Sequence, residues 1–284
     1  MMAKILFAIS ALLLITFITL VIIRVRNDQE VNQIWRLCSA HATRSLETVP
    51  AENRFTQDMV AGLPAPVQRY FFHAIAPGTP VGSSVSLVMS GSFRLGQDKP
   101  WLSMWAKQII SAKGFVWKAA IGRSLFQMRG ADYYINGSGR MQFSLWGLLP
   151  LVNAHSPDIV RSSIGRLAGE LVLLPTALLP NGGVSWKAID DRTIQASLKI
   201  DGEPVTLTLV IDPANGKLLK LSVPRWGDKT EDGSYSYIPF GGEYQEERTF
   251  GGFTIPSGMS AGWWFETDRY LEFFRAKIEQ AEFR

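Results

Sequence analysis

The longest apolar run of the chain occupies residues 5–23, where nineteen consecutive positions carry no charged side chain. As an α-helix this run extends roughly 28 Å, which is close to the thickness of the hydrocarbon core of a bilayer. A cleaved signal peptide would have a shorter apolar region, of about 7 to 15 residues, followed by a small-x-small cleavage site. The run ends instead in Ile-Ile-Arg-Val-Arg. The pattern therefore favours an uncleaved transmembrane anchor over residues 1–26.

A helical period continues directly after this anchor. The apolar face that it defines comprises Val31, Ile34, Trp35, Cys38, Ala42 and Leu46. This spacing predicts a helix over residues 28–46, inside a helical connector that spans residues 27–62. The opposite face mixes charges of both signs and has few cations, so we expect the helix to pack on its own domain rather than on the membrane surface.

Two further helices are predicted from spacing and from their start signals. The first covers residues 63–75, where Pro66 can occupy the first turn without losing a needed hydrogen bond. The second covers residues 156–173, because Ser156, Pro157 and Asp158 supply a hydroxyl cap, a proline at the first helical position and an acid near the positive end of the helix dipole.

Elsewhere the pattern shortens to runs rich in Val, Trp, Phe, Tyr and Ile, separated by Gly, Asn, Asp and Pro, which is typical of consecutive antiparallel strands. The predicted strands are residues 85–95, 101–110, 114–120, 125–129, 132–136, 141–146, 184–189, 193–200, 204–211, 218–223, 235–238, 242–250, 253–255 and 262–265. Residues 270–283 fit a helix as well as a strand. The predicted fold is α+β: after the transmembrane helix, residues 63–284 form a curved antiparallel sheet, or half-barrel, covered by the two helices.

Charge and composition exclude several function classes. Without Lys4, Arg24 and Arg26, 26 basic and 25 acidic side chains remain, so the domain is almost neutral and nucleic acid is not an expected partner. Three scattered histidines and one cysteine give no zinc-ligand spacing, and we predict no metal site and no cofactor. Residues 258–262 match the GxSxG pattern of hydrolases, but strand-like residues follow the serine and all three histidines precede it. We therefore do not interpret this segment as a nucleophile.

Two sets of side chains remain as candidates for a site. Arg166 and Glu170 are four residues apart on the predicted central helix and can form an ion pair there, either as a solvated surface pair or as the polar part of a catalytic cavity. Large aromatic residues occur on successive predicted strands, so the concave face of the sheet can carry an apolar pocket. The candidate ligand-binding residues are Trp105, Phe115, Trp117, Trp146 and Trp186.

Several short motifs together resemble an uncharacterised bacterial family of N-terminally membrane-anchored domains of unknown function. They are the Leu-Pro-Ala-Pro-Val-Gln-Arg-Tyr-Phe segment from Leu63, the Phe-Val-Trp strand from Phe115, Gly139-Arg140-Met141, and the Gly-Glu-Leu segment from Gly169 that leads into Leu-Pro-Thr-Ala-Leu-Leu-Pro. The likeness extends from residue 63 to the end of the chain. The order of strands and helices also resembles the half-barrel of bacterial lipoprotein carriers, which bind acyl chains between sheet and helices.

The leading hypothesis is a single-pass cell-membrane protein whose extracytoplasmic domain binds a lipid or another apolar ligand. The membrane and an apolar small molecule or acyl chain are then its expected partners. The alternatives are an acid/base enzyme that uses Glu170 and Arg166 in a cavity, and a scaffold for another envelope protein. An enclosed cavity beside Glu170 would favour the binding module or the enzyme. A filled interior with an exposed apolar patch would favour the scaffold.

Overall fold

A computed structural model describes residues 1–40 and 53–284 of the chain. Within these residues, thirteen antiparallel strands form one sheet in the order β6-β5-β4-β3-β2-β1-β13-β12-β11-β10-β9-β8-β7. The strands are β1 (Ser84–Phe93), β2 (Leu102–Ser111), β3 (Gly114–Ile121), β4 (Met128–Ile135), β5 (Ser138–Leu145), β6 (Leu149–Ala154), β7 (Ser185–Ala188), β8 (Thr193–Ile200), β9 (Glu203–Ile211), β10 (Leu218–Gly227), β11 (Ser236–Phe250), β12 (Phe253–Trp263) and β13 (Leu271–Phe283). The first and last strands of the sequence therefore pair near the middle of the sheet.

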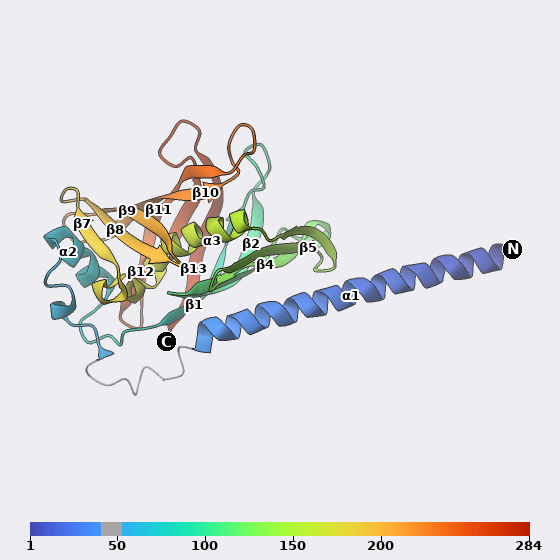
Figure 1. Cartoon of the computed structure of the whole chain (residues 1–284), viewed down its shortest axis with the longest axis horizontal. Helices are drawn as coiled ribbons and strands as arrows, with labels where there is room; N and C mark the ends of the chain where they lie inside the picture. Colours follow the sequence, from blue (N-terminus) through green and yellow to red (C-terminus); the bar gives the residue numbers. More distant parts are fainter. Residues whose placement is uncertain (41–52) are drawn as a thin grey trace.

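The sheet is open and curls around helix α3 (Pro157–Glu170), as Figure 1 shows. This helix contacts β4 and β5 near one edge of the sheet and β9 and β10 near the other edge, which requires the sheet to bend around it. The outermost strands, β6 and β7, do not pair with each other, so the barrel is not closed. The predicted α+β half-barrel is confirmed.

Helix α3 forms because its sequence supplies both its start and its buried face. The Ser156 hydroxyl accepts a hydrogen bond of 3.2 Å from the backbone N–H of Ile159, and Pro157 occupies the first turn. Leu167 and Ala168 are fully buried against the concave face. A Cβ atom on Gly165 would lie 3.0 Å from Cγ of Arg225, so the glycine lets α3 and β10 approach closely at this point.

Helix α2 (Ala65–Ala74) covers the far end of the sheet, where it contacts β7, β8 and β12. Its buried face includes Val67, Tyr70 and Phe71, and the Phe71 ring packs edge-on against Trp186 at 5.4 Å. The chain between α3 and β7 forms three short 3-10 helices, Leu171–Leu173, Pro175–Leu178 and Pro180–Gly182, which fill this end of the half-barrel with leucines. The interior is therefore closed at the α2 end.

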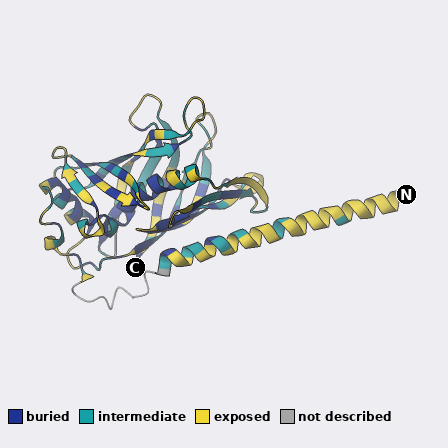
Figure 2. Cartoon of the chain, in the orientation of Figure 1, coloured by how far each residue is buried: buried dark blue, intermediate teal, exposed yellow. Residues whose placement is uncertain are grey.

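The N-terminal helix α1 (Met2–Ala40) is continuous, and the helix predicted from residue 28 is its last part. Val31 and Cys38 are buried against Ile109 and Val116, on the convex face of β2 and β3. Figure 2 shows the contrast between this covered end and the exposed remainder of α1. Residues 28–40 of the predicted helix thus pack on the sheet as expected, while predicted positions Ala42 and Leu46 lie outside the described residues.

Polar contacts hold the same end of α1 on the sheet. The Glu30 carboxylate accepts hydrogen bonds from the Tyr133 hydroxyl and, at 2.7 Å, from the Arg140 guanidinium. The Lys118 ammonium donates to the Asn32 side chain at 2.7 Å and lies over the Trp35 ring. These contacts fix where the apolar part of α1 leaves the domain.

Several predicted strand boundaries were wrong, because the glycines, prolines and register shifts within these segments do not end the strands. Residues 236–250 form one strand, β11, although its pairing register with β12 shifts near Glu246. Residues 253–263 also form one strand, β12. Strand β4 replaces two predicted strands, and η4 (Ser124–Phe126) precedes it. Strand β6 was missed because it is an exposed edge strand that contains Pro150. Residues 270–283 resolve as the strand β13.

The burial of Cys38 gives a direct test of how α1 packs on the sheet. Burial raises the pKa of the Cys38 thiol to about 11. We expect labelling of native Cys38 by a maleimide to be more than about 100-fold slower than labelling of the urea-unfolded chain, because only the thiolate reacts. Quenched time points analysed by mass spectrometry measure both rates. Equal rates would show that α1 does not dock on β2 and β3.

Candidate functional site

A cavity of about 580 Å³ lies between α3 and the concave face of the sheet. Its wall is mostly apolar and includes Phe93, Trp117, Phe143, Phe240, Trp263 and Phe274. Residues of the β1–β2 and β10–β11 loops line one end, and Figure 1 shows these loops rising together above the sheet. Val172 and Leu173, which follow α3, belong to the same lining, and the other leucines of this segment are buried in the core.

Small residues on two strands leave this space unfilled. Gly242 on β11 pairs with Ala261 on β12, which in turn pairs with Phe274 on β13, and all three line the cavity. A Cβ atom on Gly242 would lie 1.9 Å from the Ser260 carbonyl oxygen, so only glycine fits there. At the same level the neighbouring strands carry the larger Leu221 on β10 and Phe274 on β13, and the space therefore opens over β11 and β12.

A charged cluster centred on Arg166 interrupts the apolar wall. The Arg166 guanidinium contacts Asp132 on β4 at 2.5 Å and Glu170 at 2.8 Å, and the side chains of all three are at most 22% exposed. The Gln108 amide on β2 donates to the other Glu170 oxygen at 2.5 Å. Burial lowers and the two carboxylates raise the pKa of Arg166, with a net increase. The cluster ties α3 to the concave face of β2 and β4.

Arg225 on β10 is a second cation in the wall of the cavity, and it has a different environment. Its Nε donates to the Ser162 carbonyl at 3.0 Å, and its guanidinium lies over Phe240 and Trp263 at 4.6 and 4.9 Å. No carboxylate among residues 1–40 and 53–284 forms an ion pair with it. Burial, followed by the repulsion of Arg166, lowers the pKa of Arg225 to about 10. A positive charge is therefore held in an apolar wall without a direct counter-charge.

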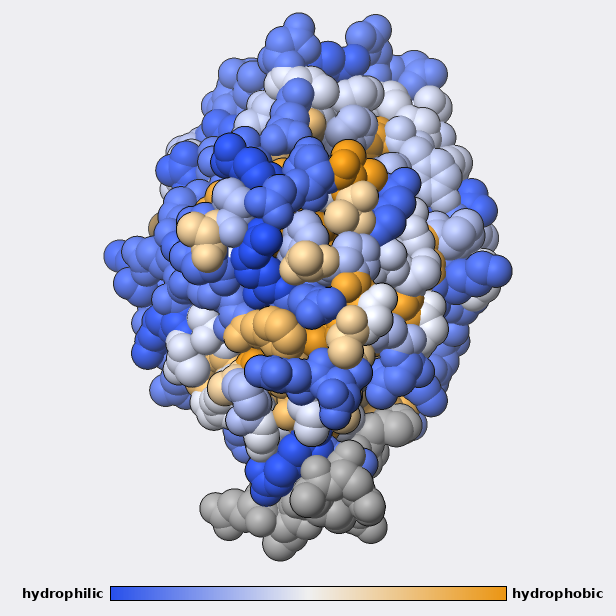
Figure 3. All heavy atoms as spheres, turned by 90° about the vertical axis from the view of Figure 1, so that its left-hand side faces the viewer, coloured by the Kyte–Doolittle hydropathy of each residue, from blue (hydrophilic) through white to orange (hydrophobic). Residues whose placement is uncertain are grey.

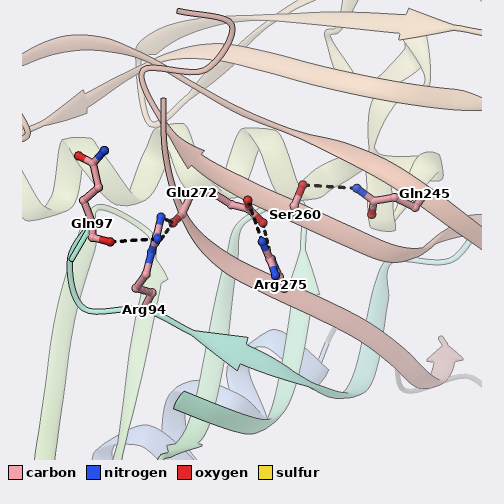
Figure 4. Close-up of polar contacts among 6 residues, drawn as sticks. All are labelled: Arg94, Gln97, Gln245, Ser260, Glu272 and Arg275. Atoms are coloured by element: carbon pink, nitrogen blue, oxygen red, sulfur yellow. Dashed lines mark hydrogen bonds and ion pairs between the residues drawn. The ribbon is translucent and has the colours of Figure 1, made fainter. Parts of the chain in front are cut away.

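Arg94 adds a third cation at the loop end of the cavity (Figure 4). Its guanidinium donates to the backbone carbonyls of Glu272, at 3.0 and 2.5 Å, and Gln97, at 3.0 Å. The Glu272 carboxylate is engaged by Arg275 at 2.6 Å instead. Within the described part of the chain, Arg94 thus also has no carboxylate partner. Asp228 and Lys229 of the same lining pair with each other at 2.8 Å, so Arg94 leaves a net positive charge at the loop end.

The structure places the predicted site residues in different surroundings. Arg166, Glu170 and Trp117 line the cavity, and Phe115 is buried beneath Arg166, 4.5 Å from its guanidinium. The other three do not line it. Trp105 is on the convex face, 49% exposed, Trp146 lies at the tip between β5 and β6, and Trp186 packs under α2. Successive side chains of a strand point to opposite faces of the sheet. Trp105 therefore points outward, because Met104 and Ala106 on either side of it point into the core.

Sequence reasoning missed Asp132, Gln108 and Arg225. Gln108 had a visible signal, since it is the polar residue among the inward-pointing positions of β2. Asp132 and Arg225 had no such signal in the sequence. The strand pairing that brings β4 and β10 to opposite sides of α3 is not encoded in local spacing. Ser260 of the GxSxG segment lies inside β12 and is 3.4 Å from the Gln245 amide, so it is not on a strand-to-helix turn.

These features define an open half-barrel domain with an internal apolar cavity, joined to an N-terminal helix that is long and apolar enough to cross a membrane. The chain belongs to DUF6920, a family of unknown function, which matches residues 61–283. The predicted family resemblance from residue 63 onward is thereby confirmed.

Solved structures with a similar arrangement include a LolA superfamily protein from Nitrosomonas europaea. It shares 10% identity with a TM-score of 0.41, over 78% of this chain and 92% of that chain. A porin-like protein from Bacteroides uniformis shares 8% identity with a TM-score of 0.27, over 72% of this chain and 99% of that chain. No curated protein matches the sequence.

Proposed function

We propose that this protein is a membrane-tethered binding module for a lipid or another amphiphile. Its apolar part occupies the cavity between α3 and the sheet, and its anionic group binds Arg225. In this proposal α1 spans the membrane and the domain, residues 63–284, lies on the extracytoplasmic side. Reporter fusions at the C-terminus test that topology, and a reporter active only in the cytoplasm would overturn it.

The observation that carries the proposal is the unfilled apolar cavity itself. Its volume of about 580 Å³ lies within the roughly 300–1,000 Å³ of ordinary ligand sites. Its wall combines aromatic residues with a small number of charged groups, which is the composition expected of a site that binds an apolar body and orients a polar end. The scaffold hypothesis expects a filled interior and is less well supported.

Extraction of the purified full-length protein tests the proposal directly. Detergent-purified protein is washed, extracted with organic solvent and analysed by mass spectrometry. We expect one class of apolar or amphiphilic molecule in near-stoichiometric amount, beyond what the same detergent micelles carry without protein. Repeated extracts that contain only the bulk lipid mixture would count against a binding module.

Arg225, which has no carboxylate partner among the described residues, predicts the sign of the ligand's charge. An isolated buried cation is costly, whereas a charge-assisted hydrogen bond to an anion contributes about 1.5–3 kcal/mol. We expect Arg225→Gln to weaken binding of a fluorescent fatty acid about tenfold and to leave binding of the matching fatty alcohol unchanged. Fluorescence titration measures both affinities.

A matched control for this variant is Arg161→Gln. Arg161 also lies over a tryptophan ring, Trp226 at 4.8 Å, but pairs with Glu203 outside the cavity. It is expected to leave both affinities unchanged. A phosphate-headed lipid should respond to Arg225→Gln as the fatty acid does, and inorganic phosphate alone should not compete. If Arg225→Gln weakens the binding of the fatty acid and the fatty alcohol equally, Arg225 does not bind an anionic group of the ligand.

One observation favours the acid/base enzyme as a second candidate: Glu170 lies in the cavity wall beside Arg166 rather than in open solvent. Against it, both Glu170 oxygens already accept hydrogen bonds, from Arg166 and from Gln108, so a substrate proton would have to displace one of these donors. Incubation of the protein with a lipid extract distinguishes the two. A product that appears with the wild type and not with Glu170→Gln would support the enzyme.

A further inference from the structure

A group of exposed apolar side chains lies at the tips of two neighbouring hairpins. We name it the hairpin-tip patch, and its members are Leu125, Phe126, Trp146, Leu149, Leu151 and Val152. Leu125 and Phe126 are 71% and 76% exposed, in the turn before β4, and the others lie in the β5–β6 turn and on β6. The Trp146 indole N–H donates to the Leu125 carbonyl at 3.1 Å and joins the two hairpins.

One residue in each hairpin turn has positive φ. Ser124 has φ 51° and Trp146 has φ 54°, in the left-handed region that residues other than glycine rarely adopt. Ser124 directly precedes Leu125, and Trp146 is itself a member of the patch. The other end of the molecule differs, since Figure 3 shows a mainly hydrophilic face with small separate apolar areas.

The patch lies beside the point where α1 changes from apolar to charged. The uncharged run of α1 ends at Ile23. Next to it, a Cβ atom on Gly147 would lie only 3.7 Å from Cζ of Arg24. Figure 1 shows the β4–β5 end of the sheet extending along α1 toward its N-terminus. If α1 spans the membrane, the hairpin tips therefore lie at the level of the bilayer surface.

We infer that the hairpin-tip patch inserts into the interfacial region of the leaflet that α1 enters. This inference rests on the membrane anchor of the proposed function, but not on the cavity. The patch has the composition of an interfacial surface: a tryptophan, large apolar side chains, and the basic residues Arg24 and Arg129 close to the turn. Lipid also covers part of the exposed edge strand β6.

Docking of this patch joins the membrane to the cavity. Val152 belongs to both the patch and the cavity wall, so the two apolar surfaces are continuous at β6. An acyl chain leaving the bilayer beside α1 then has an apolar route into the half-barrel. The bilayer is the occupant of the patch, and the cavity is the destination of a lipid taken from it.

Site-directed fluorescence on the full chain in lipid nanodiscs tests the docking. In a Cys38→Ser background, Leu125→Cys is labelled with an environment-sensitive fluorophore, and the nanodiscs carry lipids with a spin-labelled acyl chain. Ile189→Cys is the matched control, because Ile189 is also exposed, at 53%, but follows β7 at the opposite edge of the sheet. We expect blue-shifted, strongly quenched emission at position 125 and aqueous, unquenched emission at position 189.

The outcomes separate docking from anchoring. Co-elution of the chain with the nanodiscs shows that α1 anchors it in the bilayer, independently of the fluorescence at positions 125 and 189. Co-elution with equal quenching at both positions, or with none at either, overturns the docking. A second substitution, Phe126→Glu in the Leu125→Cys chain, is expected to reduce quenching several-fold, because a carboxylate next to the probe opposes insertion. Unchanged quenching in the chain with Phe126→Glu would also overturn the docking.

Discussion

Replacing Arg166 by methionine is expected to destabilise the domain by about 3–5 kcal/mol, because it leaves two buried carboxylates without their common cation. Asp132 and Glu170 both contact Arg166, and the side chains of the three are 15%, 22% and 15% exposed. Coulomb repulsion between the remaining acids then adds to their desolvation cost. Equilibrium urea unfolding of the full chain in mild detergent, followed by tryptophan fluorescence, measures the loss.

A rescue variant distinguishes unpaired charge from lost packing. Adding Asp132→Asn and Glu170→Gln to Arg166→Met removes both charges, and we expect most of the stability to return. Arg161→Met is the control, since Arg161 pairs with Glu203 at the surface, where ion pairs contribute about 0–1 kcal/mol. If the triple variant is as unstable as the single one, the stacking of Arg166 on Phe115 and Trp117 is the dominant contribution instead.

Strand-like and helical spacing predicted which segments form strands and helices, and with the resemblance to lipoprotein carriers it predicted the half-barrel. Strands of the N-terminal half, such as β2 and β3, follow from short runs rich in apolar and aromatic residues, and Ser156 and Pro157 define the start of α3. Spacing did not show that β1 pairs with β13, because strand order depends on contacts between residues far apart in the sequence, such as Val85 with Phe283. It also did not show that strands continue through prolines and register shifts.

The site could be predicted only in part, for a related reason. The i, i+4 spacing of Arg166 and Glu170 indicated an ion pair, but the same spacing suits an exposed helix face. Its burial depends on Asp132 and Gln108, which reach it from two separate strands. Aromatic content indicated an apolar concave face, yet Trp105 points outward, since the face of a strand residue depends on register and not on residue type.

In the proposed function and the inferred docking, the cavity binds the ligand and the hairpin-tip patch contacts the membrane. The patch lies on the side from which α1 emerges, and the unpaired Arg225 and Arg94 are part of the cavity wall, with Arg94 at its loop end. An amphiphile that enters beside β6 with its chain leading meets the aromatic wall along β3 to β5. In this proposal its anionic group is then neutralised by Arg225, which has no carboxylate partner among the described residues.

Filling the cavity with a single large side chain is expected to reduce ligand affinity about 10- to 100-fold, since overpacking an occupied site costs about 1–3 kcal/mol. Ala261 is the position of choice, because it lines the cavity on β12 opposite the small Gly242. In Ala261→Trp the indole occupies space that the ligand needs, whereas Ala261→Leu fills less and should give a smaller loss. Titration with a fluorescent fatty acid measures both.

The control for this variant is Ala214→Trp, in the exposed turn between β9 and β10, which is expected to bind the probe as the wild type does. Urea unfolding of Ala261→Trp separates exclusion from misfolding, because an indole in a real void leaves stability close to that of the wild type or raises it. A stable Ala261→Trp protein that still binds the fatty acid with wild-type affinity would place the ligand elsewhere. The apolar space over β11 and β12 would then have no role in binding.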